Sequence, residues 1–157
     1  MVFTLQHFSL PTRLPDWSES FACAVFFAQL RRKQEDAASI WVLDPHQLNK
    51  LGCGRLGMVA LHEGTSDPVN LDAMQWHPKR VPPTEPLKTI AVAPIYINRR
   101  MVQQRARFTQ MGDSFLPLDE QFGGELVQQD RLRRIVLPPE TFADAEEFPF
   151  RRRPRRL

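Results

Sequence analysis

The residues best suited to chemistry stand close together near the start of the sequence. A polar pair, Gln6 and His7, precedes a Pro-Thr-Arg turn that ends at Arg13, and Asp16 and Trp17 follow. Arg13 and Asp16 are three residues apart near an expected helix start, which allows a charge-assisted hydrogen bond between them. Trp17 would add a rigid apolar wall with one N–H donor. A small polar binding site is one interpretation of this stretch.

The other interpretation is structural. Asp16 and Ser18 are both plausible N-caps of the following helix, and Asp16 and Glu19 have the spacing of a capping box. In this interpretation Arg13 pairs with Asp16, and Trp17 belongs to the core. The polar pair before the turn has no role in it, so both interpretations stay open.

Other motifs that could carry chemistry fail a test of context or spacing. The segment GCGRLG (52–57) matches G-x-G-x-x-G. A dinucleotide fingerprint must follow a strand and open a helix, whereas these glycines follow a predicted helix, so we predict a loop there. The segment LHEGT (61–65) lacks the second histidine of a zinc-protease helix, and neither Cys23 nor Cys53 has metal or redox spacing. No metal site is predicted.

One apolar run dominates the predicted elements. Residues 21–28 are apolar throughout, and a helix without a polar face is usually a buried helix. We therefore predict a buried helix over about residues 19–33, ended by the charged segment RRKQED (31–36). The large side chains expected inside are Phe21, Val25, Phe26 and Phe27.

The remaining patterns predict a mixed α+β fold. Strands are expected at 39–43, 89–97, 106–111 and 133–138, and short helices at 45–51 and 139–148. Gly52 is the expected stop of the first of these helices, and Pro94 predicts that strand 89–97 is an edge strand or carries a bulge. Repeated prolines make 52–87 a long irregular insertion. The expected architecture is a small sheet packed on one buried helix, without βαβ alternation.

Length and composition indicate one globular domain. The chain has 157 residues, of which 42% are apolar. Residues 1–150 are expected to form the domain and 151–157 a basic disordered tail. No apolar run reaches the length of a membrane span, and residues 1–20 do not resemble a secretory signal, so a reduced, cytoplasmic setting is expected.

The net charge of +3 comes from the end of the chain. The last seven residues, RRRPRRL, hold five arginines. Without them, 16 basic residues face 18 acidic ones. Contact with nucleic acid is therefore expected only through the arginine tail at 151–157.

Several separated motifs follow one another along the chain. The first is the Gln-His, Leu-Pro-Thr-Arg-Leu and Asp-Trp block at residues 6–17, followed by Phe-Ala at 27–28. The later ones are IWVLDPHQLN (40–49), INRRMVQQRARFT (97–109) and IVLP (135–138). Together they resemble the FRG domain, a bacterial family named for a Phe-Arg-Gly motif near its start. The resemblance covers residues 5–138 in the family's order.

The resemblance implies an enzyme-like interpretation. Its members resemble modules of toxin, phage-defence or mobile-element systems, and one interpretation is an ADP-ribosyltransferase-like pocket with NAD as substrate. The implied cofactor-binding residues are His7, Thr12, Arg13, Trp17 and Arg99. The implied catalytic residues are Arg13, Asp16 and Gln104. Because a glutamine cannot act as a general base, Gln104 could only orient the substrate.

Departures from the family pattern favour an inactive copy. Ser9 and Ala106 replace glycines of the family motifs, Pro15 replaces a leucine, and the Phe-Arg-Gly motif itself is absent. We therefore expect an incomplete domain, inactive as an isolated chain, whose sheet another protein chain completes. The alternatives are a non-enzymatic interaction module and a fragment without independent function. The substrate and the partner are not identified by the sequence.

Overall fold

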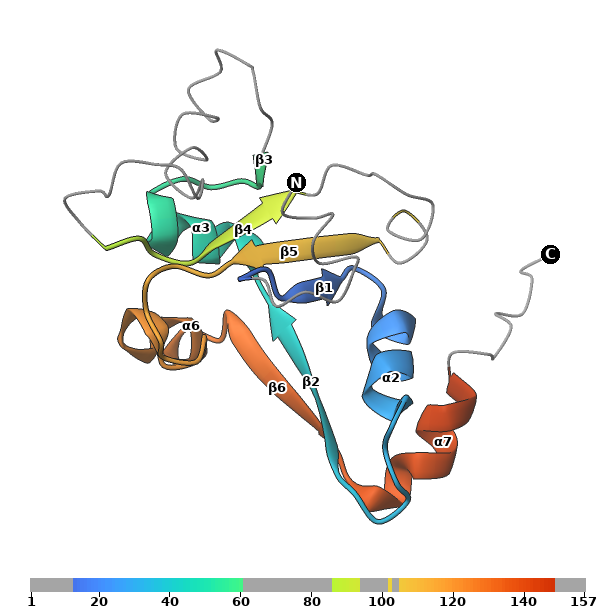
Figure 1. Cartoon of the computed structure of the whole chain (residues 1–157). Helices are drawn as coiled ribbons and strands as arrows, with labels where there is room; N and C mark the ends of the chain where they lie inside the picture. Colours follow the sequence, from blue (N-terminus) through green and yellow to red (C-terminus); the bar gives the residue numbers. More distant parts are fainter. Residues whose placement is uncertain (1–12, 61–85, 94–101, 103–104, 149–157) are drawn as a thin grey trace.

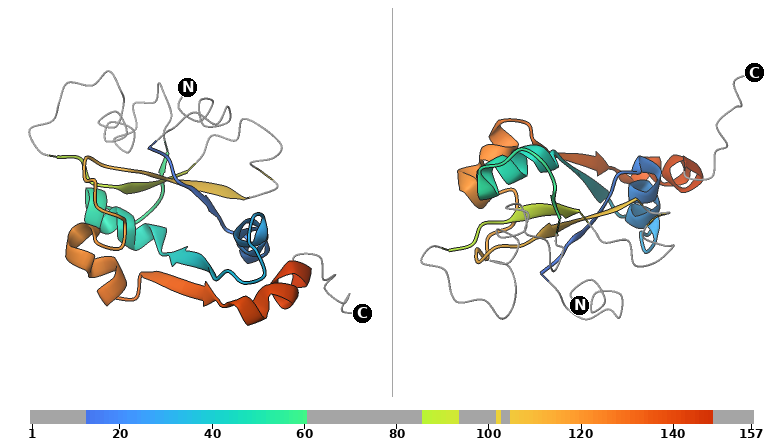
Figure 2. Two further views of the ribbon diagram at one scale, coloured as in Figure 1. Left: turned by 60° about the horizontal axis from the view of Figure 1, so that its bottom comes forward. Right: turned by 90° about the horizontal axis from the view of Figure 1, so that it is seen from above.

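The computed structural model describes residues 13–60, 86–93, 102 and 105–148. These residues form the predicted mixed α+β fold, but they contain two separate sheets rather than one small sheet. Figure 1 shows a four-stranded sheet above a long two-stranded ribbon. In the left view of Figure 2, the helices and the ribbon lie on one side of the four-stranded sheet.

The four-stranded sheet joins distant parts of the sequence. Its strands are β1 (Asp16–Ser18), β3 (Val59–Ala60), β4 (Ile90–Ala93) and β5 (Ala106–Gln110), in the order β1-β5-β4-β3. Only the pair β3–β4 is parallel. The prediction of an edge strand at 89–97 is wrong for its described part, because β4 has a partner on each side. Residues 94–97 lie outside the described residues.

The ribbon consists of two strands that the sequence predicts. Strand β2 (Ala38–Leu43) pairs antiparallel with β6 (Leu132–Leu137) along its whole length, from Ala38 opposite Leu137 to Leu43 opposite Leu132. Their β-branched and aromatic residues favour extended backbone. Nearly 90 residues separate the two strands in the sequence, so their pairing is a long-range contact that joins the two ends of the described fold.

The described residues include four α-helices and two 3-10 turns. The α-helices are α2 (Phe21–Gln29), α3 (Pro45–Cys53), α6 (Glu125–Gln128) and α7 (Phe142–Glu147). The 3-10 turns are η1 (Gln121–Gly124) and η2 (Pro139–Thr141). Thus the helix predicted at 139–148 is present as η2 followed by α7, whereas β1, β3, η1 and α6 are too short for the sequence patterns to predict.

Helix α3 begins as predicted and ends two residues later than predicted. The Asp44 carboxylate accepts the N–H groups of His46 and Gln47 at the start. Gly54, with φ of 73°, closes the end in the left-handed region that glycine tolerates. Gly52 lies inside the helix, where a Cβ atom would come within 2.3 Å of the Thr89 carbonyl oxygen. It therefore allows close packing of α3 on the strand segment and does not act as a stop.

Helix α2 is shorter than predicted and has a different cap. The Ser20 hydroxyl accepts the N–H of Cys23, so neither Asp16 nor Ser18 caps the helix. Asp16 lies in β1, and the Glu19 carboxylate forms an ion pair of 2.6 Å with Arg107. The expected capping box is therefore absent, because the strand pairing of β1 uses the residues that would have formed it.

Arg32 explains why α2 ends early. Its guanidinium donates to the carbonyl oxygens of Leu137 and Pro138, at 3.0 and 2.6 Å, and to the Gln29 side chain at 3.0 Å. Arg32, which was predicted to lie in the helix, thus connects the end of α2 to the end of β6 by hydrogen bonds. The chain then turns directly into β2.

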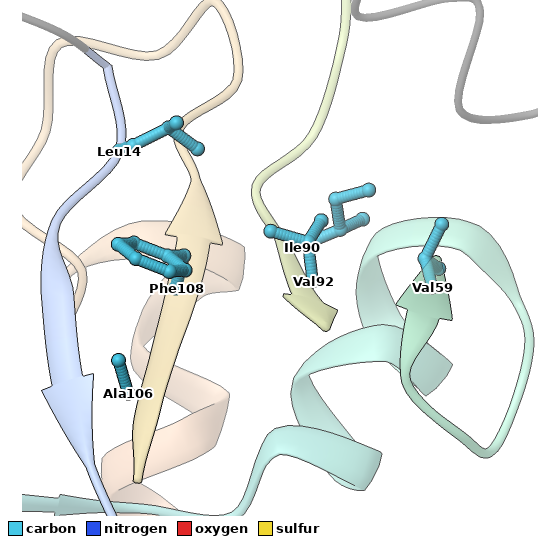
Figure 3. Close-up of a cluster of buried hydrophobic side chains, with 6 residues drawn as sticks. All are labelled: Leu14, Val59, Ile90, Val92, Ala106 and Phe108. Atoms are coloured by element: carbon cyan, nitrogen blue, oxygen red, sulfur yellow. The ribbon is translucent and has the colours of Figure 1, made fainter. Parts of the chain in front are cut away.

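The described core is divided into three clusters of buried apolar side chains. The sheet cluster, drawn in Figure 3, consists of Leu14, Val59, Ile90, Val92, Ala106 and Phe108. The central cluster consists of Leu48, Ala91, Leu126 and Leu132, with Trp17 packed against it. The end cluster consists of Val25, Ile40 and Ala145. Each cluster lies where different elements meet, and none surrounds α2.

The prediction that the apolar helix is buried is wrong. Only Val25 of α2 is buried, whereas Phe21, Phe26 and Phe27 are 49%, 41% and 45% exposed. Helix α3 packs closely against the four-stranded sheet through fully buried Leu48 and Asn49, more extensively than α2 does at β1.

Asn49 joins α3 to the middle of the sheet. Its side-chain oxygen accepts the Ala91 N–H at 2.6 Å, and its amide nitrogen donates to the Ala91 carbonyl oxygen at 2.9 Å. The same nitrogen donates to the Gly57 carbonyl oxygen. One side chain therefore satisfies both backbone groups of a buried strand residue, in the manner of a neighbouring strand.

Candidate functional site

Arg13 is fixed at the entrance to β1. Its carbonyl oxygen accepts the Met111 N–H at 2.9 Å, which extends the pairing with β5 beyond the strand. Its guanidinium lies 3.5 Å from Asp113, whose other carboxylate oxygen accepts the Leu87 N–H at 2.9 Å. The predicted bond between Arg13 and Asp16 is thus replaced by a half-exposed ion pair with Asp113.

Asp16 and Trp17 are neighbours whose side chains point to opposite faces of the sheet. Asp16 stands opposite Phe108, and Trp17 opposite Arg107. The indole ring packs against the central cluster, and its N–H donates to the Thr109 hydroxyl at 3.1 Å. Asp16 is exposed on the other face, which is the face of the sheet cluster. Alternation along β1 therefore separates two residues that the sequence places side by side.

Gln110 is a polar residue of this second face that sequence patterns did not single out. It lies two residues after Phe108 on β5, so its side chain is on the same face as that of Asp16, about 7–8 Å away by sheet geometry. Gln110 is buried and donates to the Met111 carbonyl oxygen at 3.3 Å. Gln110 ends a strand whose other residues are mostly buried, and it directly follows the Phe-Thr of the motif at 97–109. A polar residue at that position is the sequence signal that points to it.

Four predicted site residues lie outside the described part of the chain. They are His7, Thr12, Arg99 and Gln104. The expected convergence of His7, Arg13, Asp16 and Gln104 on one concave site therefore stays a prediction. Among the described residues, Asp16 and Gln110 share this face, while the register places Arg13 on the face of Trp17.

The buried polar side chains around the sheet have partners inside the fold. Asn49 binds Ala91, as described above. The Thr89 hydroxyl donates to the Gln121 side chain at 2.7 Å and accepts the Gly112 N–H at 3.0 Å. The Gln121 amide in turn donates to a backbone carbonyl at 2.8 Å. These groups hold β4, β5 and η1 together, since a buried polar group without a partner is costly.

A small hollow lies between α3 and α6, away from Arg13. It is lined by Gln47, Lys50, Leu51, Glu125, Leu126, Gln129 and Arg131. Arg131 already lies 3.7 Å from the Asp44 carboxylate, and the Gln129 amide donates to Glu125. Its polar groups are thus largely used within the fold, and it does not include any of the predicted site residues.

The outer side of α2 is an exposed apolar feature of the described surface. Small residues, Ala24, Val25 and Ala28, turn toward the end cluster. The three phenylalanines of the helix and Leu30 are exposed, and Phe148 of the adjoining segment is exposed beside Phe21. Their rings meet edge to face, with centroids 5.7 Å apart. The side chains of Phe26, Phe27 and Leu30 point away from the end cluster, and we call these three exposed side chains the α2 face.

The described residues contain no group of three or more histidine, cysteine, aspartate or glutamate side chains placed to hold a metal ion. Within the same residues, no helix has the length and apolarity needed to cross a membrane.

The comparison with protein families finds one match. The FRG domain model matches residues 1–37, the segment that includes Arg13, β1 and α2. This match supports a relationship to the FRG family. No curated protein and no solved structure matches the chain. The FRG-like motifs at 40–49, 97–109 and 135–138 lie outside the matched segment, so their assignment stays a prediction.

Proposed function

We propose that this FRG-related chain is a non-enzymatic protein-interaction module that binds through the α2 face. The observation that carries the proposal is the exposure of Phe26, Phe27 and Leu30 together on the side of a nine-residue apolar helix that points away from the core. Contiguous exposed apolar surface on a protein of this size marks an interaction site more often than scattered single residues do. Aromatic side chains are also the residue type enriched at the centres of interfaces.

The roles of the predicted site residues support this proposal over catalysis. The Arg13 cation is occupied by Asp113, and the Trp17 ring and N–H are used by the central cluster and Thr109. Both side chains therefore make contacts that stabilise the fold, and these contacts do not require a catalytic role. The helix that follows them in the matched segment is the part that faces outward.

Substitution on α2 should separate an exposed face from a core. We expect Phe26→Asn to lower the free energy of unfolding by about 1–2 kcal/mol, because the ring is 41% exposed and loses only part of a full burial. Val25→Asn is the matched control: the same new side chain at a buried position should cost about 3 kcal/mol or more, because a buried polar group adds to the lost apolar contact. Urea unfolding of both variants measures this difference. Equal, large losses would mean that the α2 face is covered within the fold, which would contradict the proposal.

An ADP-ribosyltransferase-like pocket with NAD as substrate is the second candidate. It is favoured by the strand register, which directs the Asp16 and Gln110 side chains to one face of the sheet, whereas Arg13, paired opposite Met111, falls on the other face by alternation. Placement in a toxin, phage-defence or mobile-element system of the bacterial cytoplasm belongs to this candidate. The same candidate includes a domain at residues 1–150 and a partner chain that completes its sheet.

Incubation with labelled NAD tests this candidate against the first. For an interaction module we expect neither ADP-ribosyl transfer nor hydrolysis by the purified chain. Turnover that is abolished by Arg13→Ala, in a variant that remains folded, would replace the first candidate by the second.

A further inference from the structure

We propose that the exposed face of the β2–β6 ribbon binds a carboxylate group of a protein partner, through the Arg134 guanidinium and the Trp41 ring. The site is separate from the α2 face and contains none of the site residues predicted from the sequence. The inference is carried by the way the fold holds this one charged side chain while leaving part of it without a partner.

The two faces of the ribbon have different surroundings. Ile40 is buried on one face, where it packs with Val25 of α2 in the end cluster. Trp41 is the next residue of β2, so alternation turns its ring to the opposite face, where it is 38% exposed. The register places Arg134 directly opposite Trp41, and Ser39 lies two residues before it. These three side chains therefore share the face of the ribbon that points away from α2.

Two contacts hold the Arg134 guanidinium on this face. Its Nε atom donates to the Ser39 hydroxyl at 2.9 Å, and its Cζ atom lies 5.9 Å from the centroid of the Trp41 ring. At such distances an arginine is attracted to an aromatic ring. Within the described part of the chain, the terminal nitrogens Nη1 and Nη2 have no hydrogen-bond partner. A planar pair of donors is thus presented at the surface in a restrained orientation.

The neighbouring arginines are already paired with acids. Arg131 lies 3.7 Å from Asp44, and Arg133 forms an ion pair with Asp130. Arg134 forms no ion pair with any described residue. Its own face of the ribbon, made by positions 39, 41, 43, 132, 134 and 136, includes no acidic side chain. The charge that fits beside Arg134 is therefore negative and has to come from another molecule.

A carboxylate matches this site in shape and in charge. Its two oxygens lie in one plane and can accept from both terminal nitrogens of an arginine. Its single negative charge equals the single unpaired cation, whereas a phosphate group on a protein carries more. Val136, on the same face, is 52% exposed and adds an apolar neighbour to Trp41. A partner segment with an acidic residue between apolar ones would satisfy the whole site, and tryptophan and arginine dominate the energy of many interfaces.

Titration of the full chain with a small peptide tests the site. The probe is acetyl-Val-Glu-Val-amide, and the matched probe, acetyl-Val-Gln-Val-amide, lacks only the charge. We expect the glutamate peptide to cause saturable NMR shifts of the Arg134 Nε–H and the Trp41 indole N–H. The glutamine peptide should bind about 10-fold more weakly or less, because a charge-assisted pair is lost. Inorganic phosphate should also bind more weakly than the glutamate peptide.

Two exposed arginines one residue apart supply the control. Arg134→Gln should weaken binding of the glutamate peptide about 10-fold or more. Arg133→Gln removes the same charge from the opposite face of the ribbon, and screening by salt should limit its effect to about 2-fold or less. Arg134→Lys should remain about 3-fold weaker than the original chain, because lysine keeps the charge but not the planar pair of donors. The NMR spectra also show that each variant is folded.

The inference would be overturned by a titration without saturable shifts of the two side-chain signals. Equal weakening by Arg134→Gln and Arg133→Gln would also overturn it, because general attraction between charges would then explain the binding. Phosphate binding as tight as that of the glutamate peptide would assign a different ligand to the site. None of these measurements involves the α2 face, so the proposed function is tested separately.

Discussion

Replacing Asn49 with alanine is expected to lower the free energy of unfolding by about 2–6 kcal/mol. The Asn49 side chain is fully buried and satisfies both the N–H and the carbonyl oxygen of Ala91. Without it, two buried backbone groups of β4 lose their partner, and each such loss costs about 1–3 kcal/mol. Domains of this size are stable by only about 5–15 kcal/mol, so the variant would be close to unfolding.

Lys50→Ala is the control for this prediction. Lys50 is the next residue of the same helix and is exposed, so its replacement should change the free energy of unfolding by about 0.5 kcal/mol or less. Chemical denaturation measures both variants. If Asn49→Ala were as stable as Lys50→Ala, the bridge between α3 and β4 would not hold the sheet.

Leu14→Ala should produce the second large effect, a loss of about 2–5 kcal/mol in the free energy of unfolding. Leu14 is 1% exposed and packs in the sheet cluster with Phe108. It follows Arg13 directly, so the result also tests whether the family-like block serves packing. The cost has two parts, the lost burial of the leucine side chain and the cavity that remains.

The same substitution at an exposed leucine provides the comparison. Leu56 is 68% exposed, and Leu56→Ala should change the free energy of unfolding by about 0.5 kcal/mol or less. The pair is measured by thermal or urea unfolding under identical conditions. Similar values for the two variants would mean that Leu14 is not part of a packed core.

The elements predictable from sequence are those whose signals are local. The strands β2 and β6 follow from their β-branched and aromatic composition. The start of α3 follows from Asp44 and Pro45, because capping depends on residues within one turn. By contrast, Gly52 acts through close packing on Thr89, which is distant in the sequence. A local pattern cannot distinguish that role from a helix stop.

Helix α2 shows why apolar composition does not determine burial. The pattern predicted a buried helix because every residue of the run is apolar. In the fold, the small residues Ala24 and Ala28 allow close approach to the end cluster, and the larger Phe26 and Phe27 point away. The sequence contains this division by size, but which side is covered depends on where β2 and α7 lie. That information comes from long-range pairing of β2 with β6.

The candidate site was predicted only in part for a similar reason. Sequence proximity suggested that Arg13, Asp16 and Trp17 act together. Strand alternation separates Asp16 from Trp17, and the ion pair of Arg13 is with Asp113, about a hundred residues away. Gln110 joins the Asp16 face only through the register of β1 with β5. Register is a property of the folded sheet and is not visible in either segment alone.

Hydroxyl-radical labelling of phenylalanine side chains is the most direct test of the claim that α2 presents an exposed apolar surface. In a dilute sample, we expect Phe26 and Phe27 to react readily and Phe108, which is 5% exposed, to be protected. Equal protection of Phe26, Phe27 and Phe108 in the dilute sample would contradict the claim, because it would place the large side chains of α2 in the core.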